Sequence, residues 1–140
     1  MKKILVPTDA SEYSRRALET ALEFARKFNA EIELLFVMHS PISYDSNFNS
    51  YIISPEQIEE VGNHVFEATL NGIDISDVSV IKKKSQAEKP AKGILEEIEN
   101  EKIDLVIMGS HGYGAVAGSL IGSVSQHVLH KAKCSVLIVK

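Results

Sequence analysis

The sequence is short of cysteine, tryptophan, positive charge and long apolar runs. Its 140 residues include one cysteine and no tryptophan, so no internal disulfide can form and a hydrophobic core has to hold the fold. No apolar run approaches the ~18 residues of a membrane-spanning helix, and the start of the chain lacks the apolar region of a signal peptide. We therefore expect a cytoplasmic protein without a membrane partner.

The charge balance is mildly acidic, with 15 lysines and arginines against 19 aspartates and glutamates and a formal net charge of −4. Nucleic-acid binding depends on basic surfaces that neutralise phosphates, so we expect no nucleic-acid partner. The triplet Lys82-Lys83-Lys84 is too short to change this expectation, and we interpret it as the solvated end of a strand. Cys134 precedes an apolar run and is interpreted as a small core residue.

Short apolar runs alternate with amphipathic segments along the whole chain. The apolar runs predict five strands, at residues 2–8, 31–38, 78–83, 104–109 and 135–140. The periodic segments predict four helices, at residues 11–28, 54–70, 90–101 and 122–132, and a long loop is expected at residues 39–54. This alternation predicts one α/β domain over residues 1–140, an open and mostly parallel sheet with helices on both faces.

Two of the expected helices carry clear local signals. In the first, six residues share one apolar stripe that should face the sheet: Ala17, Leu18, Ala21, Leu22, Ala25 and Phe28. The second opens with Ser54 as N-cap, Pro55 at the first helical position and Gln57 in the place that completes a capping box. Both helices are therefore predicted from local sequence alone.

Five glycines fall within residues 105–128, directly after the fourth expected strand. In an open parallel sheet, ligands bind outside the carboxyl ends of the strands, where this segment and the "VPTD" segment after the first strand would meet. Gly122-Ser123 would begin the last helix, whose free N–H groups and dipole favour an anion. We expect Ser123 and Ser125 to add hydroxyl donors, and Gly109 and Gly112 to let the loop fold over a ligand.

Two familiar glycine motifs do not fit this segment. A P-loop ends in Gly-Lys-Ser/Thr, whereas Val124 follows Ser123 and the loop has no lysine. A dinucleotide fingerprint follows the first strand and has an acidic residue about 20 positions later, whereas no aspartate or glutamate follows Gly109.

The pattern Gly109-x2-Gly112-x9-Gly122-Ser123 resembles the nucleotide-binding signature of the universal stress protein family. The resemblance extends to "ILVPTDASEYSRRAL", "DLVIMGSHG" and "GSVSQHVLHKAKCSVLIVK". It implies a Rossmann-like, twisted five-stranded parallel sheet in the order 3-2-1-4-5, a homodimer, and bound ATP (or AMP or ADP), with Mg²⁺ as an option. Glu88-Lys89 departs from the family, in which a glycine is common before Pro90, and Ser135 stands where a proline is common.

The resemblance also implies roles for individual residues. Asp9 would contact adenosine, the backbone near Val37 would contact adenine, and glycines and serines of the loop would hold ribose and phosphates. The nucleotide-binding residues expected are Pro7, Thr8, Asp9, Val37, Met108, Gly109, His111, Gly112, Gly122, Ser123, Val124 and Ser125. We expect no metal-ligating side chains and no catalytic residue.

Several of these residues have plainer interpretations. Asp9 could serve only as the N-cap of the first helix, with Glu12 completing a capping box. His111 is more readily a loop-ordering residue than a catalyst, and His127 and His130 are interpreted as surface or dimer-facing. Tyr44, Phe48 and Tyr51 could cover adenine or anchor their loop, and Met38 and Met108 could belong to the core or to a pocket wall.

The function that we predict is adenine-nucleotide binding by a homodimeric sensor or regulator of the stress response. Phosphoryl transfer needs charge neutralisation and an oriented nucleophile, and the glycine loop offers neither lysine nor arginine, so the protein is not expected to be an enzyme. The alternatives are a slow ATPase or nucleotidyl-transfer enzyme, and a nucleotide-free interaction module. A dimer interface is predicted on the edge strand at Val136, Leu137, Ile138 and Val139.

Overall fold

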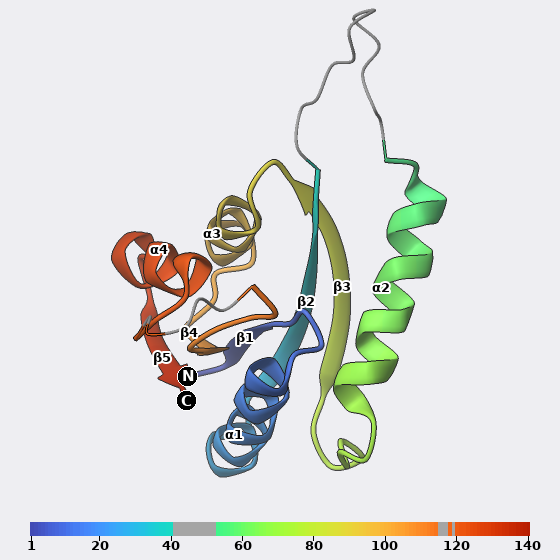
Figure 1. The fold of residues 1–140 in the computed structure, drawn as a ribbon. Coiled ribbons are helices and arrows are strands. Elements are labelled where there is room, and N and C mark those ends of the chain that lie inside the picture. Colours follow the sequence, from blue (N-terminus) through green and yellow to red (C-terminus); the bar gives the residue numbers. More distant parts are fainter. Residues whose placement is uncertain (41–52, 115–117, 119) are drawn as a thin grey trace, which may run out of the picture.

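A computed structural model describes residues 1–40, 53–114, 118 and 120–140 (Figure 1). Strands and helices alternate along the chain, as the sequence predicts. In order they are β1 (Lys3–Pro7), α1 (Glu12–Phe28), β2 (Glu31–His39), α2 (Pro55–Leu70), β3 (Val80–Ala87), α3 (Pro90–Asn100), β4 (Leu105–Gly109), α4 (Ser123–Lys131) and β5 (Ser135–Val139).

The five strands form one parallel sheet in the order β3-β2-β1-β4-β5 (Figure 1). This confirms the predicted α/β fold and its strand order. The order changes direction at β1, which pairs with β2 on one side and with β4 on the other. At such a point the loops after neighbouring strands diverge and leave room for a ligand.

Alternate residues of each strand face opposite sides of the sheet, and each side has its own core. Ile4, Val6 and Leu34 pack on the side of α1 and α2. Their neighbours Leu5 and Leu35 pack on the side of α3 and α4. The helices therefore cover both faces of the sheet, two on each.

The first two helices agree with their local signals at one end and depart from them at another. Ser54 and Gln57 form the expected capping box of α2. Phe28, however, is 49% exposed, so the prediction that it faces the sheet is wrong. It is the last residue of α1, and its ring contacts Phe24 on the helix surface at 6.1 Å between centroids.

The lysine triplet lies inside β3 and not at its solvated end, because β3 runs on to Ala87. The sheet edge tolerates these side chains because they find partners: Lys83 pairs with Glu97, and Lys84 Nζ lies 2.6 Å from Glu59 Oε1. Cys134 is partly buried against the α3/α4 core, and burial raises the pKa of its thiol, which disfavours the reactive thiolate. Within the described ranges, no helix combines the length and apolarity needed to cross a membrane.

Candidate functional site

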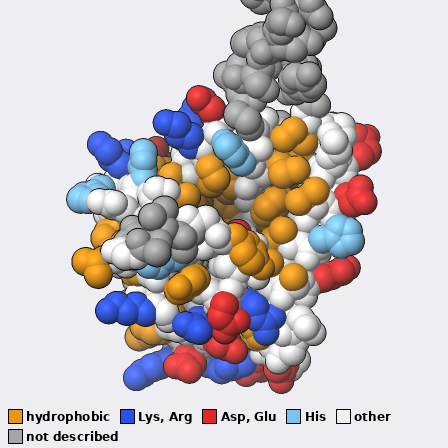
Figure 2. Space-filling model, in the orientation of Figure 1, with side chains coloured by type: hydrophobic (Ala, Val, Ile, Leu, Met, Phe, Trp, Pro, Cys, Tyr) orange, Lys and Arg blue, Asp and Glu red, His pale blue; other side chains and the backbone are white. Residues whose placement is uncertain are grey.

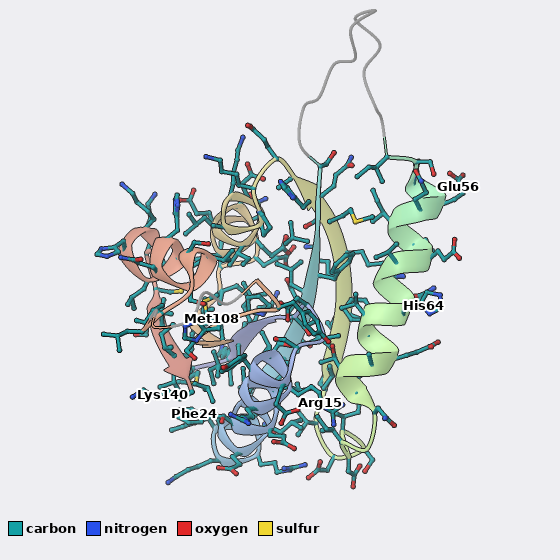
Figure 3. The ribbon with its side chains drawn as sticks, in the orientation of Figure 1. Arg15, Phe24, Glu56, His64, Met108 and Lys140 are labelled. Carbon is teal, nitrogen blue, oxygen red and sulfur yellow. The ribbon has the colours of Figure 1, made fainter. Side chains whose placement is uncertain are left out.

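A cavity of about 780 Å³ lies at the carboxyl ends of β1, β2 and β4, between the starts of α3 and α4. Hydrophobic side chains gather around a hollow on the face drawn in Figure 2. Met108, at the end of β4, lies centrally between the α1 and the α3/α4 sides (Figure 3). Much of the lining is apolar, including Leu35, Val37 and Ile94, which suits the planar base of a nucleotide.

All twelve residues predicted for the nucleotide site line this cavity. Ten further residues line it as well: Ser14, Leu35, Phe36, His39, Pro90, Ile94, Tyr113, Gly114, Ile121 and Gln126. The strand residues among them could have been found from their place beside Val37. Pro90 and Ile94 could not, because only the packing of α3 against β2 brings them to the cavity.

Asp9 connects the two loops that frame the cavity. Its Oδ1 accepts a hydrogen bond from the Ser11 N–H at 2.9 Å, and its Oδ2 accepts one from the Tyr113 N–H at 3.1 Å. Ser11 is the N-cap of α1, so the interpretation of Asp9 as the cap is wrong. Ala10, whose φ of 65° is left-handed, turns the chain between them, which puts Ser11 at the helix start.

Tyr113 strengthens the same connection from the other loop. Its hydroxyl donates to the carbonyl of Ala10 at 2.8 Å, although 76% of the residue is exposed. Gly112 precedes it with no room for a side chain, because an added Cβ would overlap Asp9 Oδ2. The β4–α4 loop is thus fixed to the β1–α1 loop at the cavity.

Two glycines of the signature, Gly109 and Gly122, also allow close packing between protein segments. A Cβ on Gly109 would lie 2.6 Å from Tyr13 Cβ and 2.8 Å from the Tyr13 carbonyl carbon, so this glycine permits α1 to approach β4. A Cβ on Gly122 would lie 3.2 Å from the Ser110 carbonyl oxygen. Both positions serve packing between protein segments, a role that was not predicted from the sequence.

The start of α4 offers hydrogen-bond donors to the cavity. Gly122 is its N-cap and provides no side-chain cap, so the N–H groups of the first turn, from Ser123 to Ser125, are available to a ligand. The Ser123 side chain is exposed beside them. The Ser125 hydroxyl donates to the Gly109 carbonyl at 2.7 Å, so it also joins the start of α4 to the end of β4.

The histidines, the loop aromatic residues and Met38 lie in different environments. The His111 ring packs against Tyr13 at 5.3 Å between centroids, and its Nδ1 lies 3.0 Å from Ser110 Oγ, contacts that order the loop. His127 and His130 are exposed on α4. Met38 packs against the α1/α2 core, away from the cavity. Tyr44, Phe48 and Tyr51 lie outside the described residues.

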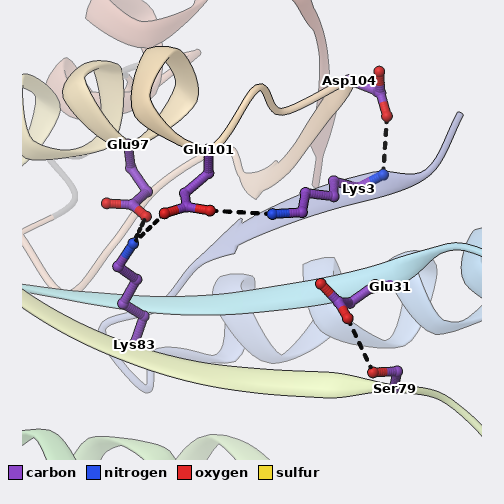
Figure 4. Close-up of polar contacts among 7 residues, drawn as sticks. All are labelled: Lys3, Glu31, Ser79, Lys83, Glu97, Glu101 and Asp104. Atoms are coloured by element: carbon purple, nitrogen blue, oxygen red, sulfur yellow. Dashed lines mark hydrogen bonds and ion pairs between the residues drawn. The ribbon is translucent and has the colours of Figure 1, made fainter.

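A charged cluster underlies the α3 side of the sheet (Figure 4). Lys83 of β3 pairs with Glu97 and lies 3.0 Å from Glu101 Oε1, and Lys3 lies 3.1 Å from Glu101 Oε2. Burial alone would lower the pKa of Lys83, but these two carboxylates outweigh it and raise the pKa. Glu33 of β2 is only 6% exposed, and its Oε1 has no hydrogen-bond partner. Burial, followed by the nearby Glu97 carboxyl, raises the pKa of Glu33 to about 7.

The sequence profile of the universal stress protein family matches residues 1–140, the whole of this chain. The chain belongs to the universal stress protein family. It is 31% identical over 140 residues to universal stress protein MJ0531 of Methanocaldococcus jannaschii, covering 99% of this chain and 82% of that protein. It is 30% identical over 145 residues to universal stress protein YxiE of Bacillus subtilis, covering 99% and 98%.

Solved structures of the family share the fold at lower identity. A family protein from Arabidopsis thaliana, solved with AMP bound, is 22% identical with a TM-score of 0.65, covering 100% of this chain and 92% of that one. A universal stress protein from Archaeoglobus fulgidus, solved in complex with dAMP, is 17% identical with a TM-score of 0.67, covering 100% and 98%. These similarities support the same doubly covered parallel sheet.

Proposed function

We propose that this universal stress protein binds an adenine nucleotide (ATP, ADP or AMP) in the cavity at the carboxyl ends of its strands and acts as a sensor or regulator. The observation that carries the proposal is the convergence of all twelve signature-derived residues on that one cavity. The apolar wall at Leu35 and Val37 suits the base, and the first turn of α4 suits a phosphate. Relatives with this fold hold AMP and dAMP, which agrees with such a ligand.

Binding without efficient turnover is the role that we favour. Fast phosphoryl transfer needs an oriented nucleophile and cationic groups around the transferred phosphate. The best-placed imidazole, that of His111, already packs on Tyr13 and contacts Ser110. With Mg²⁺ and ATP, we expect hydrolysis well below the ~1–1000 per second of ordinary enzymes. Turnover above about 1 per second that is lost in His111→Ala would favour the ATPase instead.

We further propose a homodimer formed through β5, an edge strand of the sheet. The Val139 carbonyl accepts from the Ser110 N–H at 2.8 Å, so the backbone groups of Val139 point toward β4. Because these groups alternate in direction along a strand, those of Ile138 point to the open edge. Antiparallel pairing of residues 136–139 with a second copy would satisfy them.

Proline scanning of β5 tests this interface. Ile138→Pro should yield folded monomers of somewhat lower stability, because it removes a backbone donor at the open edge together with the packing of the Ile138 side chain. Leu137→Pro should disrupt the β4 pairing and the fold itself. Analytical ultracentrifugation at micromolar concentration measures the oligomeric state. A monomeric parent protein, with and without nucleotide, would refute the arrangement.

The nucleotide proposal is tested by identifying and titrating the ligand. Mass spectrometry of the denatured purified protein should reveal a co-purified adenine nucleotide, and calorimetry should then give its affinity. At 100 times its dissociation constant, the nucleotide should raise the free energy of unfolding by roughly 2.7 kcal/mol. Absence of a bound nucleotide together with no binding at millimolar concentration would favour the interaction module.

A matched pair of variants tests whether the ligand binds in the cavity. Val37→Phe should fill the apolar wall and abolish nucleotide-dependent stabilisation. Val61→Phe adds the same group to the exposed surface of α2, where Val61 is 38% exposed, and should leave stabilisation unchanged. Equal stabilisation of both variants would remove the cavity from the binding site.

A further inference from the structure

A pair of buried carboxyl groups, those of Glu33 and Glu97, lies between β2 and α3 and has no part in the proposed nucleotide site. Both residues are 6% exposed, and Glu33 lies close to the Glu97 carboxyl. Among the described residues, Glu33 Oε1 has no hydrogen-bond partner. An ionised carboxylate at such a place loses its water without gaining an ion pair of its own, so the protonated form is favoured. Glu33 is therefore a proton-binding group inside a contact between helix and sheet.

The charged groups around this pair come from each element that packs against Glu33. Lys83 of β3 pairs with Glu97 and lies 3.0 Å from Glu101 Oε1 (Figure 4). Lys3 of β1 lies 3.1 Å from Glu101 Oε2. The two lysines and the two carboxylates of α3 balance one another in charge. Ionised Glu33 adds a further carboxylate, so its proton decides whether this contact is neutral or carries an excess negative charge.

The same two elements, β2 and α3, form the apolar wall of the cavity. Leu35 and Val37 lie on the same face of β2 as Glu33, because alternate residues of a strand point to one side. Ile94, which lines the cavity from α3, lies on the same side of the helix as Glu97, since residues spaced by about one turn are neighbours. The carboxyl pair is therefore about one helical turn away from the wall.

α3 packs directly on this wall. A Cβ on Gly93 would lie 2.7 Å from Val37 Cγ1, so helix and strand already touch beside the cavity. Ile94 is buried in the core beneath α3. Because a hydrogen-bonded helix moves largely as one body, a displacement of the turn at Glu97 also moves Ile94. Repulsion between two ionised carboxylates beneath α3 would therefore alter the wall that contacts the base.

We propose that the Glu33–Glu97 carboxyl pair is a proton-sensitive switch that sets the position of α3 and, through it, the affinity of the cavity for a nucleotide. This inference rests on the proposed nucleotide function and adds a regulation to that site. With a proton on the pair, α3 lies against β2 and the apolar wall is complete. When Glu33 ionises, α3 moves away from the sheet and the base loses contacts. Burial, followed by the Glu97 carboxyl, raises the pKa of Glu33 to about 7, so nucleotide affinity falls as the pH rises through neutrality.

Calorimetric titration of the purified full-length protein and of Glu33→Gln with AMP and with ATP, at about pH 5.5 and about pH 8, tests the inference. Glu33→Gln keeps the shape of the protonated side chain and cannot ionise. Parent and variant should bind equally at the lower pH, and the parent should bind about three- to tenfold more weakly at the higher pH. His39 and His111 line the cavity and also respond to pH, but both are present in both proteins, so the comparison cancels their effect.

Glu31→Gln is the matched control. Glu31 lies on the same strand, is partly exposed and accepts a hydrogen bond from Ser79 Oγ at 3.3 Å (Figure 4). This variant should follow the parent at both pH values. An identical pH dependence of nucleotide affinity in the parent and in Glu33→Gln would overturn the inference while leaving the proposed function intact. Failure of both nucleotides to bind to any of these proteins would overturn both.

Amide hydrogen exchange tests the movement of α3 without a ligand. At the higher pH, the amides of residues 94–98 should exchange faster in the parent than in Glu33→Gln, and at the lower pH the two proteins should agree. The rates are compared with those of residues 17–25 in α1, so that a change in overall stability affects both helices and cancels. If α3 and α1 respond equally to the substitution, the carboxyl pair affects only the stability of the whole fold and the inference is wrong.

Discussion

The two faces of the sheet are built from the same strands, but their packing differs. On the α1/α2 face, Ile4, Val6 and Leu34 are fully buried in a continuous apolar core. On the α3/α4 face, Leu35 is just as buried from solvent, yet it also lines the cavity. One side of the sheet is packed as a continuous core, and on the other side the packing stops short of the strand ends and leaves the cavity.

The buried polar groups on the two faces also differ in their charge. On the α1/α2 side, next to the cavity, the Thr8 hydroxyl lies 3.0 Å from Ser14 Oγ and 2.7 Å from Thr69 Oγ, so these neutral groups satisfy one another. Beneath α3, Glu33 is buried close to a second carboxyl, that of Glu97, with one lysine between the helix and the sheet. Hydroxyl groups do not titrate in the neutral range, whereas the buried Glu33 carboxyl does, so we expect the Glu33–Glu97 pair to make stability depend on pH.

Truncating neighbouring leucines should show the largest difference between the faces. Leu34→Ala leaves a closed void against α1 and should cost about 3–4 kcal/mol in the free energy of unfolding. Leu35→Ala enlarges a cavity that already exists, so it should cost about 1–2 kcal/mol less and weaken nucleotide binding. Urea denaturation and calorimetry on both variants measure this, and equal losses without a change in affinity would contradict it.

The second-largest difference between the two faces is expected when one glycine on each face is replaced by alanine. Gly109→Ala meets the backbone of Tyr13, which cannot move alone, and should cost about 2–3 kcal/mol. Gly93→Ala meets the Val37 side chain, at 2.7 Å from Cγ1, and more loosely Ala87 Cβ at 3.2 Å. Val37 can turn into the cavity, and the Ala87 contact needs a shift of only a few tenths of an ångström. A gain in helix propensity of ~1 kcal/mol offsets that shift, so stability should hold while nucleotide affinity falls. Similar melting temperatures for the two variants would show that α1 adapts.

The buried carboxyl of Glu33 on the α3 side should make the free energy of unfolding depend on pH. Because the pKa of Glu33 is raised from 4.5 to about 7, the folded state holds a proton that the unfolded state releases between these values. Stability is therefore highest below about pH 4.5 with respect to this group, falls as the pH rises toward 7, and levels off above it.

Glu33→Gln removes that titration. At pH 8 the variant should be more stable than the parent by about 1–2 kcal/mol, and the difference should vanish at pH 4.5. Glu31→Gln, on the same strand and partly exposed, is the control. Denaturant melts across this pH range measure the effect, and a constant difference would rule out Glu33 as its origin.

The smallest effect is expected where the two loops join. Tyr113→Phe removes only the hydrogen bond to the Ala10 carbonyl and should cost about 0.5–1 kcal/mol. Amide hydrogen exchange at Ser11 and Tyr113 should speed up, because Asp9 then holds the two loops alone. Tyr13→Phe is the control, since the Tyr13 hydroxyl has no hydrogen bond to a described residue. An unchanged exchange rate in Tyr113→Phe would mean that the hydrogen bonds of Asp9 alone hold the two loops together.

Local sequence predicted the elements whose signals are local. The stripe of α1, the capping box at Ser54 and Gln57, and the start of α4 at Gly122 all followed from near neighbours in the chain. The prediction failed at Phe28, where the stripe continued beyond the sheet, and at the end of β3, where polar lysines concealed a strand. The periodicity of apolar residues contains no information about where a sheet ends or which strand lies at its edge.

The sequence by itself determined the α/β alternation, because burial patterns are properties of the chain, and its resemblance to the universal stress protein family implied the twelve residues around the cavity. Only the tertiary structure decided that Gly109 is needed by Tyr13, that Asp9 holds Tyr113, and that α3 closes the apolar wall. It also placed Glu33 beside Glu97, a contact between distant segments that costs desolvation energy and that no local preference favours. Such contacts arise when strands pair in a particular order, and their energies depend on neighbours that the chain brings together only on folding.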